Sequence, residues 1–154
     1  MARNTAGSIS FAGENGHEIP RREWELMGFD LMMTNQKPLD LLLVMLGGND
    51  LLQGNSVEAV AERMEKFLGK ISLDKEKIVL IAPPAMKPGA WITQERLLED
   101  SVRCISAYRS VAHRVGIRFV DTTDWEIEVT FDGVHYSEKG HHIFAENLSQ
   151  HLKI

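Results

Sequence analysis

The segment LDLLLVMLGG, residues 39–48, decides the fold class of this chain. Its run from Leu39 to Leu46 is apolar except at Asp40, and Gly47-Gly48 ends it. A short apolar run bounded by turn residues is typical of a strand buried on both faces, as in a parallel sheet. The run is far shorter than the roughly 20 apolar residues that a membrane-spanning helix needs. We therefore expect a buried parallel strand here and no membrane segment.

Strands and helices alternate on both sides of this run. Further strands are predicted at Ser8–Ala12, Ile78–Ala82 and Ile117–Val120. Helices are predicted over residues 20–34, after an N-cap at Ser56, over a segment that buries Leu98, Val102, Ile105 and Ala112, and after an N-cap at Ser137. This β-α-β-α-β-α-β-α order predicts an α/β fold, in which helices cover both faces of a parallel sheet. Ligands in such folds bind at the carboxyl ends of the strands.

Composition narrows the class of partner. A length of 154 residues predicts one domain, and the net charge of −5 offers no basic face for nucleic acid or acidic membranes. Cys104 is the single cysteine and lies in a helical pattern, so it is interpreted as a small buried hydrophobe. Met1–Ser10 lacks an apolar signal core. The sequence as printed predicts a cytoplasmic protein, although a signal peptide encoded upstream would not be visible in it.

Polar residues that could carry chemistry follow the predicted strands. Asp132 and His135 lie three residues apart before the last helix, so the carboxylate can bond one imidazole nitrogen and leave the other as a general base. Asn49 follows the buried strand, where its side-chain N–H groups could stabilise an oxyanion. Gly16 offers a backbone N–H without a side chain to obstruct a substrate. Alone, each could equally be an ordinary turn residue.

Together these blocks resemble the SGNH (GDSL-type) hydrolases. The matching blocks are Gly-Gly-Asn-Asp at 47–50, Asp-Gly-Val-His at 132–135 and Phe-Ala-Gly-Glu-Asn-Gly at 11–16. The resemblance implies a flavodoxin-like three-layer α/β/α sandwich and hydrolysis of acyl esters without a cofactor. It also implies that Gly16 and Asn49 are oxyanion donors and that Asp132 and His135 are the acid–base pair. Asp50 would orient the Asn49 loop rather than touch substrate.

The family's first block, a strand ending in Gly-Asp-Ser with the nucleophile, is missing from the pattern. Only about a dozen residues precede the glycine block, and Ser8 and Ser10 fall within its predicted strand. An alternative alignment places residues 9–15 on the first block, with Glu14 in place of the serine. We therefore expect one SGNH-like domain over residues 1–154, truncated at its N-terminus, with a nucleophile that this sequence does not locate.

Other aromatic and histidine residues are weaker candidates. Trp91 follows Pro83-Pro84 in a loop and is a candidate for lining the substrate cleft, whereas Trp24 and Trp125 are expected to pack against the sheet. His141 and His142 are expected in the first turns of the last helix. The sequence shows no cysteines or paired acidic ligands at suitable spacing beside them, so no metal site is predicted.

Two functions from different classes remain open at this stage. The first is an ester hydrolase that acts on small acyl, lipid or carbohydrate esters. The second is a catalytically silent SGNH-fold protein that binds an acylated or carbohydrate ligand or serves in assembly. The expected partner is a small-molecule ester. Loss of a central strand would also favour a homo-oligomer or an exchange of segments between copies.

Overall fold

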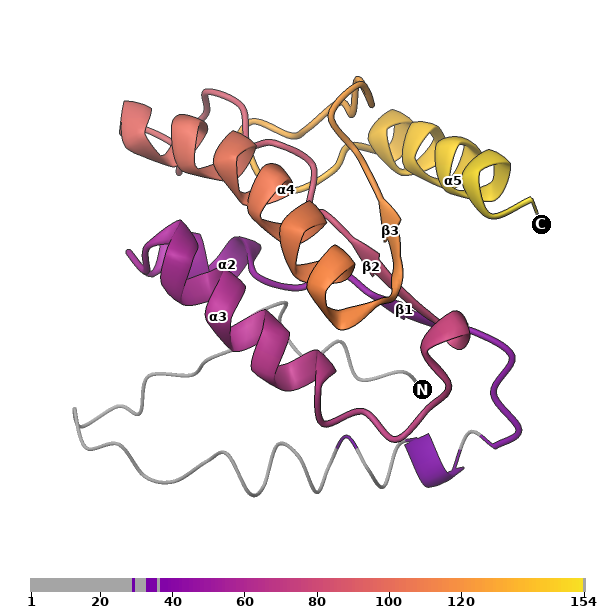
Figure 1. The fold of residues 1–154 in the computed structure, drawn as a ribbon. Coiled ribbons are helices and arrows are strands. Elements are labelled where there is room, and N and C mark those ends of the chain that lie inside the picture. Colours follow the sequence, from indigo (N-terminus) through magenta and orange to yellow (C-terminus); the bar gives the residue numbers. More distant parts are fainter. Residues whose placement is uncertain (1–28, 30–32, 36, 154) are drawn as a thin grey trace.

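The computed structural model describes residue 29, residues 33–35 and residues 37–153 (Figure 1). The predicted strand Ser8–Ala12 lies outside these residues, and so do Gly16, Trp24 and both candidate serines near the start of the chain. Of the predicted helix over residues 20–34, the described positions Phe29, Met33 and Thr34 are helical.

The described strands form one parallel sheet. They are β1 (Leu42–Val44), β2 (Ile78–Ile81) and β3 (Arg118–Val120), in the order β1-β2-β3. Leu43 pairs with Val79 and Leu80 pairs with Phe119, and both pairings are parallel. The predicted parallel sheet is therefore confirmed, although the regular part of β1 is shorter than the apolar run from Leu39 to Leu46.

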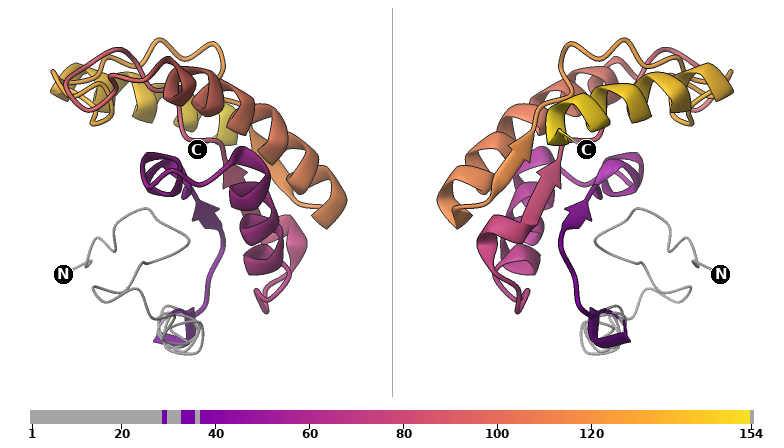
Figure 2. Two further views of the ribbon diagram at one scale, coloured as in Figure 1. Left: turned by 90° about the vertical axis from the view of Figure 1, so that its left-hand side faces the viewer. Right: turned by 90° about the vertical axis from the view of Figure 1, so that its right-hand side faces the viewer.

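Alternate residues of the strands face opposite layers, as the two-residue period of a strand requires. Val44, Ile78 and Leu80 join a core with the helices α2 (Gly48–Leu52), α3 (Val57–Leu68) and α4 (Glu95–Val115). Val79, Ile81 and Val120 form a second core, against which Phe144, Leu148 and Leu152 of α5 (Glu138–Leu152) pack. Figure 2 shows α5 on the sheet face opposite α3 and α4. The molecule has the predicted three-layer α/β/α architecture.

The predicted helix starts at Ser56 and Ser137 are confirmed. The Ser56 hydroxyl accepts a hydrogen bond from the N–H of Ala59 at 3.2 Å, and the Ser137 hydroxyl accepts one from Gly140 at 3.0 Å. Each side chain satisfies one of the backbone donors that the first turn of a helix leaves unpaired. A short 3₁₀ helix, Lys75–Lys77, leads into β2.

The expected buried face of α4 is partly wrong. Ile105 and Ala112 are buried, but Val102 is 54% exposed and Leu98 is only partly buried. The core side includes Ser101, whose hydroxyl donates to the carbonyl of Leu98 and accepts from the N–H of Met86. Hydrophobic periodicity misplaces this face because a hydrogen-bonded polar residue occupies one of its positions.

Candidate active site

All three strands end at the same edge of the sheet because they run parallel (Figure 1). At that edge, β1 continues into α2 with Asn49, β2 into the loop of residues 82–94, and β3 into the segment of residues 121–137. The candidate residues Asn49, Trp91, Asp132 and His135 therefore all follow carboxyl ends of strands, where α/β folds bind their ligands.

The Asp132–His135 pair has the predicted geometry. Oδ2 of Asp132 lies 2.7 Å from Nδ1 of His135. Its other oxygen, Oδ1, accepts hydrogen bonds from the N–H groups of Val134 at 2.8 Å and His135 at 2.9 Å. Asp132 is almost fully buried, whereas the side chain of His135 is 62% exposed. One oxygen thus fixes the turn and the other fixes the imidazole ring.

These contacts determine the charge of Asp132. The backbone hydrogen bond from Val134 is the largest influence that holds the pKa of the Asp132 carboxyl far below its usual range, and the bonds from His135 act in the same direction, against the effect of burial. Asp132 is therefore ionised near neutral pH and can only accept hydrogen bonds. It follows that Nδ1 of His135 carries the shared hydrogen, and that Nε2 of a neutral ring has a lone pair available.

The backbone closes tightly around this pair. The N–H of Thr130 donates to the carbonyl of His135 at 2.7 Å, and the N–H of Gly133 donates to the carbonyl of Thr130 at 3.1 Å. Gly133 adopts a φ of 86°, a left-handed conformation that glycine tolerates best. The Asp-Gly pair in the motif thus supplies both the acceptor and the turn residue that this geometry needs.

Trp91 contacts the exposed side of the pair. Its ring lies edge-on to the His135 ring, with centroids 5.2 Å apart and an interplanar angle of 81°. Trp91 is 56% exposed, so the indole lies beside the imidazole without sealing it from solvent. The structure therefore brings together three of the predicted residues: Trp91, Asp132 and His135.

Asn49 lies in the first turn of α2 rather than in a plain loop. Gly47, with a φ of 109°, precedes this helix, and Asn49 is partly buried. The next residue, Asp50, is fully buried and its Oδ1 lies 3.5 Å from Nη1 of Arg63. Asp50 therefore lies in the interior of the molecule.

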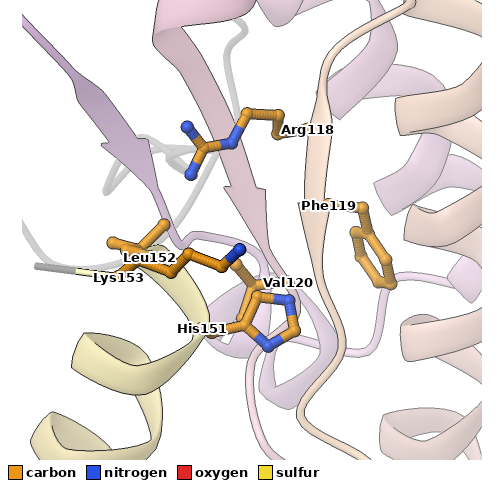
Figure 3. Close-up of a pocket in the computed structure, with 6 residues that line it drawn as sticks. All are labelled: Arg118, Phe119, Val120, His151, Leu152 and Lys153. Atoms are coloured by element: carbon orange, nitrogen blue, oxygen red, sulfur yellow. The ribbon is translucent and has the colours of Figure 1, made fainter.

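Two hollows of the described surface lie away from this site. One, of about 370 Å³, lies between β3 and the end of α5 (Figure 3) and is lined by Arg118, Phe119, Val120, His151, Leu152 and Lys153. Another, of about 630 Å³, is bordered by residues that precede β1 and β2, such as Lys37 and Lys77. Neither hollow is lined by Trp91, Asp132 or His135.

The remaining candidates have clear locations. His141 and His142 lie exposed in the first turns of α5, as predicted, and the described residues contain no group of three or more side chains able to hold a metal ion. Trp125 packs on the core beside Phe144, with ring centroids 5.3 Å apart. No helix in the described part of the chain has the length and apolar character needed to cross a bilayer.

Sequence reasoning missed one contributor to the site, Gly89. A Cβ atom there would lie 2.4 Å from the backbone of Asp132 and Gly133. The only sequence signal was the turn-forming Pro88-Gly89 pair, which does not reveal what the turn packs against.

Solved structures share this fold. A carbohydrate acetylesterase from Sinorhizobium meliloti is 20% identical with a TM-score of 0.72, and the match covers 95% of this chain and 73% of that one. An aryl esterase from M. smegmatis is 16% identical, with the same TM-score and coverage. A catalytic mutant of an acetylxylan esterase from Geobacillus stearothermophilus is 18% identical with a TM-score of 0.65, covering 86% of this chain and 67% of the other.

The sequence itself identifies the family. Among proteins of curated function none matches the chain. In contrast, the sequence profile of the GDSL-like lipase/acylhydrolase family matches residues 2–143, which include Asn49 and the Asp132–His135 pair. The chain therefore belongs to the GDSL-like lipase/acylhydrolase family.

Proposed function

We propose that this protein takes part in the hydrolysis of small acyl, lipid or carbohydrate esters by a Ser-His-Asp mechanism. The observation that carries the proposal is the 2.7 Å contact between Oδ2 of Asp132 and Nδ1 of His135. This contact leaves the basic Nε2 atom of the ring pointing away from Asp132. The His135 side chain is 62% exposed. A neutral imidazole held in this way can take a proton from a hydroxyl nucleophile.

The reaction would run in two stages. A serine oxygen attacks the acyl carbon while His135 takes the hydroxyl proton, and His135 then gives that proton to the departing alcohol. Water, activated in turn by His135, cleaves the acyl-serine and releases the acid. Asn49 and Gly16 would donate hydrogen bonds to the oxyanion of each tetrahedral intermediate. Trp91 would form one wall of the cleft, against an apolar part of the ester.

The serine itself is not assigned. Gly-Asp-Ser does not occur among the 154 residues, and His135 makes no side-chain hydrogen bond to a serine within the part of the chain that the structure describes. A silent member of the family, which binds an ester or carbohydrate ligand without cleaving it, is therefore the second candidate.

The test supplies the serine. The chain is assayed with p-nitrophenyl acetate and with a fluorophosphonate probe, first alone and then together with a Gly-Asp-Ser strand segment, added in trans or fused upstream of Met1. The proposal expects hydrolysis and labelling of the added serine, and the loss of both in His135→Ala. His142→Ala, an exposed histidine of α5, is the matched control and should keep full activity. Activity that survives His135→Ala would refute the mechanism.

A further inference from the structure

A second loop is hydrogen-bonded to the backbone of residues 131–133, which we call the Asp132 turn. The N–H of Lys87 donates to the carbonyl of Gly133 at 3.0 Å. Three residues further on, the N–H of Ala90 donates to the carbonyl of Phe131 at 2.9 Å, and the N–H of Trp91 donates to the carbonyl of Asp132 at 3.1 Å. The segment Lys87–Trp91, which we call the Trp91 loop, is thus held to the backbone that carries the Asp132 carboxylate.

This contact depends on the absence of side chains at two glycines. A Cβ atom on Gly89 would lie 2.4 Å from the carbonyl carbon of Asp132 and 2.4 Å from the nitrogen of Gly133. A Cβ atom on Gly133 would lie 2.2 Å from the carbonyl oxygen of Lys87. Real side chains do not make contacts this short with backbone, and backbone atoms cannot turn aside as the end of a flexible side chain can.

Gly89 is the more informative of the two positions. Gly133 has a positive φ, so any substitution there also strains its own backbone. No such strain applies at Gly89, whose φ lies outside the left-handed range. An alanine at residue 89 would therefore act through the distance between the two loops alone.

We propose that Gly89 is a positioning residue of the active site: it allows the Trp91 loop to close on the Asp132 turn and thereby holds the Trp91 ring against the His135 ring. The ring contact follows from the bond between the N–H of Trp91 and the carbonyl of Asp132, three residues before His135. The importance of this ring contact for catalysis rests on the proposed function, but the contact itself does not.

The test uses nuclear magnetic resonance on the full chain, without substrate. In the wild type we expect nuclear Overhauser effects between the Trp91 indole and the His135 ring, and slow exchange of the Ala90 and Trp91 amides. Gly89→Ala should lose the ring-to-ring effects and exchange these amides roughly tenfold faster or more, because local opening sets the exchange rate. Trp91→Phe identifies the signals that arise from the indole.

The control is Gly69→Ala at the end of α3, where the nearest atom to a new Cβ is 3.4 Å away and φ is −64°. It should keep both the ring-to-ring effects and the slow exchange. Retention of both in a folded Gly89→Ala would overturn the proposal. If Gly89→Ala does not fold, amide exchange in the wild type tests the proposal instead. Fast exchange at Ala90 and Trp91, with slow exchange in α4, would also overturn the proposal. A docked loop in a chain that fails to hydrolyse p-nitrophenyl acetate even with the Gly-Asp-Ser segment supplied would refute the proposed function alone.

Discussion

Asp132 accepts hydrogen bonds from the backbone of Val134, the backbone of His135 and the His135 ring. Led by the Val134 bond, these contacts and the side chain of Thr130 favour the ionised carboxylate, and so its folded-state pKa lies below the ordinary value. A group whose pKa is lowered by folding stabilises the protein above its unfolded pKa. That stabilisation is lost as the pH falls from there toward the folded value.

We predict that Asp132→Asn lowers the melting temperature at pH 7 and that its difference from wild type shrinks as the pH falls below about 4, the unfolded pKa of aspartate. The amide removes the negative charge that these hydrogen-bond donors favour. Thermal melts followed by circular dichroism from pH 7 to pH 3 measure the difference.

Asp124→Asn is the control for this prediction, since Asp124 is an exposed carboxylate of the same segment between β3 and α5. It should follow the wild type at every pH. A deficit in Asp132→Asn that is equally large at pH 7 and pH 3 would show that the charge of Asp132 does not contribute to stability.

Among the helices, α4 links the core to the site edge through Tyr108. The Tyr108 hydroxyl donates to the carbonyl of Leu46, the last residue of the apolar run, at 2.9 Å. A Cβ atom on Gly47 would lie 2.2 Å from this hydroxyl oxygen, so the glycine makes room for the bond. Tyr108 is completely buried, and burial raises the pKa of its hydroxyl, which therefore remains a neutral donor.

We predict that Tyr108→Phe lowers the free energy of unfolding by about 1–3 kcal/mol, because it removes a buried donor and leaves its acceptor unsatisfied. Urea denaturation measures the change. Tyr136→Phe is the matched control: its hydroxyl makes no hydrogen bond to any residue that the structure describes, and the expected change is within about 0.5 kcal/mol. Equal effects of the two substitutions would contradict the role given to the Leu46 bond.

At the scale of the whole molecule, the edge of the sheet beside β1 bears on self-association. Within the described residues, β1 pairs with β2 alone, and Leu43 is 40% exposed. Unpaired strand edges and exposed apolar side chains favour association with another strand. We predict that the chain self-associates at micromolar concentration, as measured by light scattering.

Substituting Leu43→Lys should weaken this association, because a lysine on an edge strand opposes strand addition. Val102→Lys introduces the same side chain at another exposed apolar position, on α4, and should leave the association unchanged. A wild-type chain that stays monomeric across the micromolar range would disprove the prediction.

The activity of the 154-residue chain by itself is also a property of the whole molecule. We predict that it hydrolyses p-nitrophenyl acetate only weakly and resists a fluorophosphonate probe. Triad enzymes that lack the nucleophile keep only roughly 10³–10⁴ over the uncatalysed rate, far below a working esterase. Mass spectrometry of the treated chain gives the labelled fraction. Stoichiometric labelling would contradict the prediction, and an adduct on Ser8 or Ser10 would identify the nucleophile.

The sequence by itself determined the features that depend on local pattern. The apolar run at residues 39–46 indicated a buried parallel strand, Ser56 and Ser137 indicated helix starts, and the spacing of Asp132 and His135 indicated their contact. Each follows from one stretch of chain, because strand burial, helix capping and a three-residue turn are set by neighbours in sequence.

Only the tertiary structure decided the features that join distant segments. The exposure of Val102 depends on how α4 lies on the sheet, and Ser101 faces the core because the N–H of Met86 reaches its hydroxyl. The contact between Trp91 and His135 depends on two loops that follow different strands. Gly89 matters because of the backbone opposite it, 43 residues further along the chain at Asp132. Local sequence does not specify such a distance, since it is set by how the sheet places the two loops.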